Sequence, residues 1–202
     1  VLNNNYLTSL PDSLGDLTHL ERLELVGNRF TSIPKCIGKL TQLENLCLTQ
    51  NRISSIPIFI TNLKKLTFLS LHENQITCLP NNFGELILLE NLNLGSNQLS
   101  KLPDSIKELK QLHSLFLDEN QFTIFPDIIT QLPNLENLYL FDNLLTHLPN
   151  NIGNMKQLQS LGLDNNVLSY LPPSIGKLKL LTSLYISGNM LTKLPLSITS
   201  LK

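Results

Sequence analysis

Residues 41–66 read TQLENLCLTQNRISSIPIFITNLKKL, and the spacing of the apolar residues in this stretch decides the fold. Leucine and isoleucine follow the pattern LxxLxLxxNxLxxLPxxIxxL, with one asparagine and one proline at fixed places. The pattern recurs every 23 residues along the whole chain without an insertion. The asparagine falls at Asn5, Asn28, Asn51, Asn74, Asn97, Asn120, Asn143, Asn166 and Asn189. Such a fixed period predicts a solenoid, in which each unit packs only on its neighbours.

The pattern also predicts the path of the chain within one unit. The LxL segment is a short strand, because alternate residues of a strand point to opposite faces. The asparagine then turns the chain inward, where its amide can both donate to and accept from the backbone of adjacent turns. The LPxxIxxL segment returns along the outer side as a helical or 3₁₀ turn that begins near the proline. In the unit of Asn97, the predicted core residues are Leu89, Leu92, Leu94, Leu99, Leu102, Ile106 and Leu109.

The repeat resembles the leucine-rich repeat family, and the resemblance covers all 202 residues. It implies an α/β solenoid: a right-handed horseshoe with a parallel β-sheet on its concave face and short helical or 3₁₀ turns on its convex face. We therefore expect residues 1–202 to form a single leucine-rich repeat domain of about nine repeats. The recurring asparagines are expected to be structural: Asn28, Asn51, Asn74, Asn97, Asn120, Asn143, Asn166 and Asn189.

The 23-residue LPxxIxxL form is similar to two branches of this family. One branch comprises intracellular eukaryotic repeats that engage Ras-type GTPases and signalling scaffolds. The other comprises bacterial proteins, notably spirochaete ones, thought to act at the envelope or on host molecules. The repeat leaves both branches open. The bacterial resemblance makes a virulence-associated role a candidate, and a secreted or envelope location is favoured over a cytoplasmic one.

The charge and cysteine content exclude several other functions. The net charge is −1, with 15 basic and 16 acidic residues, which argues against binding to nucleic-acid backbones and against steering to a membrane. No run of 18 apolar residues occurs, so we expect no membrane insertion. Cys36, Cys47 and Cys78 are odd in number and far from any CxxC spacing, which indicates isolated thiols.

Neither end of the chain shows a polar capping unit. Terminal units of solenoids normally need a polar outer face, so we expect the sequence to be a fragment and, as a second possibility, to self-associate end to end. The residues expected to face solvent or a neighbour are Leu2, Leu7, Leu10, Leu14, Ile198 and Leu201.

Alignment of the nine units turns the concave face into columns, with one residue from each unit in every column. The 12 lysines all fall outside these columns, whereas aromatic and acidic residues gather in the later units. Because adjacent strands lie about 4.8 Å apart, these residues should form one continuous surface. The predicted protein-binding residues are Phe116, Asp118, Glu119, Tyr139, Phe141, Asp142, Gly162, Asp164 and Tyr185.

This surface suggests a non-enzymatic module that binds a protein partner through the concave face. Gly162 should leave a notch between Tyr139 and Tyr185 that accepts a basic anchor residue of the partner. On this view, a leucine at position 162 would block the notch without disturbing the fold. Two alternatives stay open: the aromatic side chains stabilise the sheet by packing across strands, or the solenoid is a structural spacer.

Catalytic and metal sites are the remaining alternatives. The carboxylates of Asp118, Glu119, Asp142 and Asp164 are candidates for acid–base chemistry or for holding calcium. An open sheet keeps such groups solvated, so we expect no catalytic residue, no metal site and no cofactor. His72 with Cys47 is a poor zinc set, because the two residues offer one imidazole and one thiol at unsuitable spacing.

Overall fold

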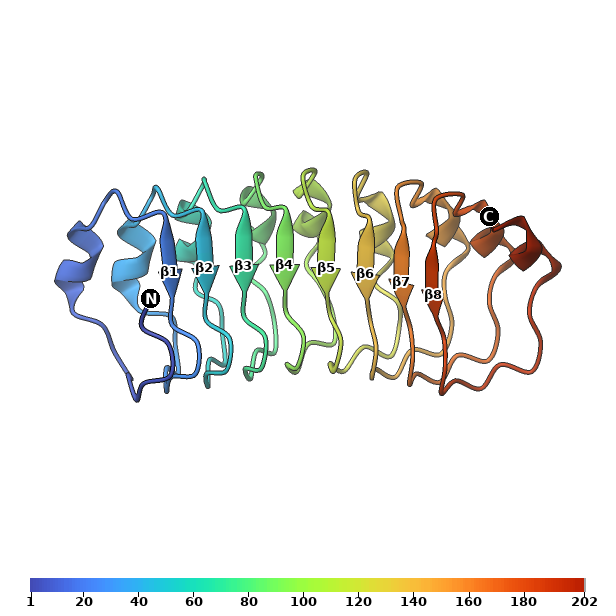
Figure 1. The fold of residues 1–202 in the computed structure, drawn as a ribbon, viewed down its shortest axis with the longest axis horizontal. Helices are drawn as coiled ribbons and strands as arrows, with labels where there is room; N and C mark the ends of the chain where they lie inside the picture. Colours follow the sequence, from blue (N-terminus) through green and yellow to red (C-terminus); the bar gives the residue numbers. More distant parts are fainter. Residues whose placement is uncertain (202) are drawn as a thin grey trace.

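The computed structural model describes residues 1–201 as a row of stacked units with the two termini at opposite ends (Figure 1). Its described part contains eight parallel strands in sequence order and nine 3₁₀ helices. In Figure 1 the helices of the middle units lie behind the sheet, and those of the end units lie beside β1 and β8. The strands are β1 (Arg22–Glu24), β2 (Asn45–Cys47), β3 (Phe68–Ser70), β4 (Asn91–Asn93), β5 (Ser114–Phe116), β6 (Asn137–Tyr139), β7 (Ser160–Gly162) and β8 (Ser183–Tyr185). The helices are η1 (Asp12–Asp16), η2 (Lys35–Lys39), η3 (Ile58–Asn62), η4 (Phe83–Glu85), η5 (Asp104–Glu108), η6 (Asp127–Gln131), η7 (Asn150–Asn154), η8 (Pro173–Lys177) and η9 (Leu196–Ser200). The predicted solenoid is confirmed.

The strands pair with a constant offset of one repeat. Leu92 of β4 aligns with Leu115 of β5, and the same step holds between all neighbouring strands. The first unit joins the sheet as well, because the amide of Leu2 donates to the carbonyl of Glu24 at 2.8 Å. Equivalent side chains of successive units therefore lie side by side, which turns a sequence column into a row on the surface.

The core lies between the sheet and the 3₁₀ helices. In the unit of Asn97, Leu102 is half-buried, and the other six predicted core residues have no exposed surface. Proline directly precedes eight of the nine helices, as expected for a residue that suits the start of a helical turn. The exception is η4, which begins three residues after Pro80. No helix within residues 1–201 has the length and apolar character needed to span a bilayer.

The side chain of each interior asparagine joins two successive turns of the solenoid. Asn97 is buried, and its Nδ2 donates to the carbonyls of Leu71 (3.0 Å), Leu94 (3.1 Å) and Gly95 (3.0 Å). Its Oδ1 accepts from the amide of Ile76 at 2.9 Å. Both ends of the side-chain amide therefore satisfy backbone groups that would otherwise be buried without partners.

The residue before each asparagine marks the end of the strand segment. Seven of these positions hold residues other than glycine with positive φ, and the two glycines, Gly27 and Gly188, have φ +65°. The seven are Asn4, Gln50, Glu73, Ser96, Glu119, Asp142 and Asn165. This left-handed backbone conformation turns the chain away from the sheet, so Glu119 and Asp142 lie in a turn at the edge of the concave face and not on a strand.

The apolar residues of the terminal units are less exposed than the sequence predicted. Leu2 is 39% exposed, but the other five predicted residues are half-buried and pack against the core. Leu7, Leu10, Leu14, Ile198 and Leu201 each pack against the core and keep part of their surface exposed to solvent. Self-association through the ends stays a prediction.

Candidate partner-binding surface

The aromatic side chains of the later units form one continuous series of ring contacts on the concave face. Phe116 and Tyr139 align across β5 and β6, and their stacked rings lie 5.0 Å apart between centroids. Tyr139 also stacks on Phe141 at 5.3 Å between centroids, and the rings of Phe141 and Tyr185 form a T-shaped pair at 6.1 Å. Aromatic pairs in this geometry stabilise a fold by more than the burial of their apolar surface alone. The packing that the alternative interpretation requires is therefore present.

Gly162 does not open the predicted notch. Phe141 lies two residues beyond the end of β6, and its ring leans across the sheet over Gly162. A Cβ atom at Gly162 would come within 2.3 Å of the Phe141 ring and 2.7 Å of the Tyr139 ring. An aromatic ring thus fills the space between Tyr139 and Tyr185, and the prediction of a notch is wrong. A leucine at position 162 would have to displace these rings; that it leaves the fold undisturbed stays a prediction.

The four predicted carboxylates differ in their hydrogen bonds. Three accept from a neighbouring unit: Glu119 from Ser96 Oγ (2.9 Å), Asp142 from Asn165 Nδ2 (2.9 Å) and Asp164 from the amide of Ser187. Asp118 is half-buried, and no side chain among residues 1–201 donates to its carboxylate. That carboxylate lies over Gly95, where a Cβ atom would come within 2.6 Å of Asp118 Oδ2.

The surroundings of Asp118 disfavour its charged form. Partial burial raises the pKa of the Asp118 carboxyl above its ordinary value. The Asp118 backbone amide and the His72 side chain lower this pKa, whereas the negative charges of Glu119 and Asp142 raise it further. Ionised Asp118 is therefore incompletely solvated, and an external cation beside it would be stabilising.

A depression of about 470 Å³ lies over β5 and β6. It is lined by Ser114, Phe116, Asp118, Asn137, Tyr139 and Phe141. Ser114 and Asn137 are the first residues of their strands, and neither is among the predicted binding residues. The sequence contains a pattern that points to these two positions. They belong to the column of first strand residues, which also has polar side chains at Asn45 and Asn91. The depression therefore combines three aromatic rings, one carboxylate and two small polar groups.

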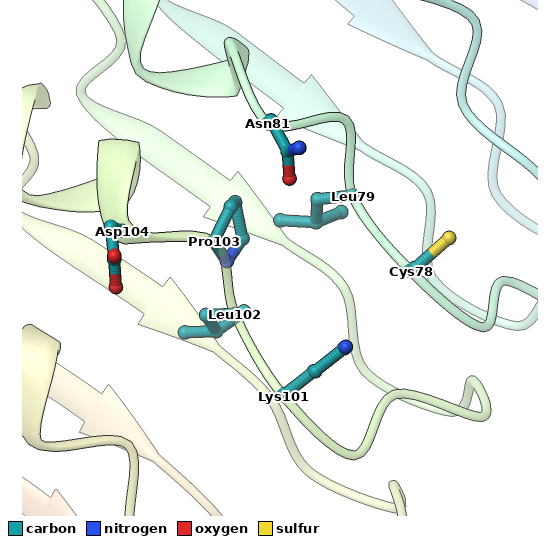
Figure 2. Close-up of a pocket in the computed structure, with 7 residues that line it drawn as sticks. All are labelled: Cys78, Leu79, Asn81, Lys101, Leu102, Pro103 and Asp104. Carbon is teal, nitrogen blue, oxygen red and sulfur yellow. The ribbon is translucent and has the colours of Figure 1, made fainter.

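Another hollow, of about 230 Å³, lies between two neighbouring units and includes the exposed thiol of Cys78. Figure 2 shows its lining: Cys78, Leu79, Asn81, Lys101, Leu102, Pro103 and Asp104. Equivalent hollows recur at the same repeat positions, between Ser9 and Ser32 and between Tyr170 and Lys193. The hollow is thus a gap that the repeat generates between adjacent units, and nothing distinguishes this copy as a specific site.

The structure does not assemble the alternative metal sites. No three His, Cys, Asp or Glu side chains within residues 1–201 lie close enough together to hold a metal ion. His72 Nε2 lies 3.2 Å from Glu73 Oε1, whereas Cys47 Sγ lies 3.4 Å from Thr49 Oγ1. The acidic residues of the later units are likewise spread along the edge of the sheet, where they bond to neighbouring side chains and amides.

Comparison with known families agrees with this architecture. A leucine-rich repeat region model matches residues 58–147, a leucine rich repeat model matches residues 133–191, and a further one matches residues 19–40. No curated protein matches the sequence.

Several solved structures resemble the chain. A leucine-rich repeat protein of Leptospira interrogans is 33% identical over 99% of this chain and 63% of its own, with a TM-score of 0.69. The plant peptide hormone receptor RGFR1, solved with RGF2, is 30% identical over 99% of this chain and 34% of its own, with a TM-score of 0.85. The leucine-rich repeat domain of the type III effector XopL is 28% identical over 100% of this chain and 72% of its own, with a TM-score of 0.87. The chain thus spans only part of the length of these proteins. By its repeat, its fold and these matches, the chain belongs to the leucine-rich repeat family.

Proposed function

We propose that the chain is a protein-binding module without catalytic activity, whose partner docks on the concave face over β5–β8 with a basic side chain. The observation that carries this proposal is the environment of Asp118. Its half-buried carboxylate has no side-chain donor within residues 1–201 and lines the same depression as three aromatic rings. Carboxylates and the faces of aromatic rings both attract cations, so the two groups favour the same kind of ligand.

The distribution of charge around the depression supports a cationic partner. Asp118, Glu119, Asp142 and Asp164 lie within two neighbouring columns, whereas the lysines lie on the outer turns and edges. Arg22 is on the first strand, far along the row from β5, and forms an ion pair with Glu24. A basic partner would therefore approach the later units without repulsion, and its binding should weaken as the salt concentration rises.

The comparisons support the general class of function. Leucine-rich repeat domains typically bind proteins, and RGFR1 was solved in complex with RGF2. The similarity to the Leptospira protein and to a type III effector favours the bacterial branch of the family. We therefore propose a host or envelope macromolecule as the partner. An intracellular scaffold of the GTPase-binding type is the alternative.

Selection of peptides from a random display library tests this proposal. We expect the peptides that bind the chain at low salt to carry a net positive charge and to bind less tightly at high salt. Replacement of Tyr139 by alanine should reduce the binding free energy of these peptides by about 2 kcal/mol, because Tyr139 is central to the ring series and lines the depression. Titration calorimetry of the selected peptides measures this loss.

The matched control is Ile124→Ala. Ile124 is 66% exposed and lies outside the sheet, so its replacement should leave the peptide affinity unchanged. Thermal unfolding of both variants separates binding from packing. If Tyr139→Ala lowers the stability but the selected peptides bind it as tightly as the parent, the rings serve sheet packing and the proposed surface is wrong.

A further inference from the structure

Two glycines on the concave face make room for side chains of the neighbouring strand segments. The Asp118 carboxylate, which follows β5, leans over Gly95 after β4, and a Cβ atom there would come within 2.6 Å of it. The Phe141 ring, which follows β6, leans the other way over Gly162 of β7, where a Cβ atom would come within 2.3 Å of the ring. The two side chains therefore lean away from each other, and the depression over β5 and β6 is the space between them.

We infer that this space is a socket for the arginine side chain of a partner, and that Gly95 and Gly162 are the positions that open it. The inference rests on the proposed function and adds to it the chemical identity of the anchor. One wall of the socket is the carboxylate of Asp118, and the other is formed by the rings of Phe141 and Tyr139. The carboxylate and the rings both attract cations.

The geometry favours arginine over lysine. A guanidinium group is planar, stacks on aromatic faces, and presents pairs of N–H donors that match the two oxygens of a carboxylate. It is also more weakly hydrated than an ammonium group, so less solvation is lost when it enters a partly buried site. The depression is lined by aromatic rings and by a carboxylate that lacks a side-chain donor within the described chain. Lysine would use the charge of this site but not the flat ring surface.

Short peptides of defined sequence test the socket directly. The probe is acetyl-Gly-Arg-Gly-amide, titrated into the isotope-labelled chain while the NMR resonances of the Tyr139 ring and the Gly95 amide are followed. The comparison peptides replace arginine with lysine or with citrulline, which keeps the shape of arginine but has no charge. We expect saturable shifts with the arginine peptide, binding about fivefold weaker with lysine, and no binding with citrulline.

Alanine substitutions at the two glycines test how the socket is built. Gly95→Ala should push the Asp118 carboxylate from its position, and Gly162→Ala should displace the Phe141 ring. Each substitution should lower the affinity for the arginine peptide by about fivefold and lower the affinity for the lysine peptide by less. Ser187→Ala is the matched control, because Ser187 occupies the same column as Gly95, is exposed, and lies outside the depression. Unfolding measurements establish that each variant remains folded.

The outcomes separate this inference from the function on which it rests. If the arginine and citrulline peptides bind equally, or if neither binds at millimolar concentration, the socket is wrong. If peptides selected from the library depend on Tyr139 but not on an arginine, the proposed function stands and the socket is overturned. If the affinity of the selected peptides is unchanged by Tyr139→Ala, both the socket and the proposed function are wrong. Arginine-dependent binding that is lost in both glycine variants supports the socket.

Discussion

Replacement of Asn97 by alanine is expected to lower the free energy of unfolding by about 3 kcal/mol, far more than an exposed asparagine would. The residue is 7% exposed, and its side chain makes four hydrogen bonds to the backbone of two successive turns. Alanine removes all four. The amide of Ile76 would then be buried without an acceptor, and unsatisfied buried groups are costly. Chemical denaturation followed by circular dichroism measures the loss.

Two control variants sharpen this prediction. Asn81→Ala changes an exposed asparagine and should alter the stability by less than about 0.5 kcal/mol. Asn97→Asp keeps the acceptor for Ile76 but loses the donors, so its cost should show how much the three carbonyl contacts contribute. Equal stabilities for Asn97→Ala and Asn81→Ala would contradict the structural role of the asparagines.

Gly84→Ala is expected to have an effect of similar size for a different reason. A Cβ atom at Gly84 would lie 1.9 Å from the carbonyl oxygen of Ser105 in the next unit, and backbone cannot move aside as a side chain can. The units on either side would have to separate. Overpacking of this kind costs about 3 kcal/mol when the neighbouring atoms cannot relax. We expect a loss of that order in the free energy of unfolding.

Gly38→Ala is the matched control, because Gly38 occupies the same repeat position. There the added Cβ atom would meet the ring of Phe59 at 2.8 Å, and this half-buried ring can rotate away. The expected loss is below about 1 kcal/mol. If both alanine variants were equally stable, the close approach of the turns at Gly84 would not constrain the fold.

The sequence predicts the fold in detail, because every unit repeats the same pattern of core residues and turn residues. The fixed period of Asn97 and its equivalents places the turns, and the leucines on either side place the core. The sequence does not predict which turns need glycine. The position of Gly84 holds Thr61, Lys107 and Thr130 in other units, so the requirement depends on the local distance between turns.

The candidate surface is predicted less completely. The period gives the column of each residue, but it does not give the direction of a side chain. Phe141 lies beyond the last residue of β6, where no strand pairing fixes it, and its ring therefore fills the space that Gly162 was expected to leave. For the same reason, the sequence does not predict that the Asp118 side chain lies over Gly95. The sequence does contain a sign of the positive φ of Glu119, because two other units have glycine, Gly27 and Gly188, at the same repeat position.

The charge of Asp118 distinguishes a binding surface from a packing surface. Its pKa is raised in the folded chain, mainly by burial. Below the pKa of the unfolded chain the group is protonated in both states and costs nothing. As the pH rises through the higher pKa of the folded chain, the charge destabilises the fold. Asp118→Asn removes this charge with little change in shape, so the variant should be at least as stable as the parent at pH 7.

The most direct test of the proposed surface is the affinity of the selected basic peptides for Asp118→Asn, measured at pH 7 beside the parent. If the depression binds a cation, the variant should bind these peptides about tenfold more weakly, because a charge-assisted hydrogen bond is replaced by a neutral one. Equal affinity of the parent and Asp118→Asn would contradict the proposal that this carboxylate recognises a partner.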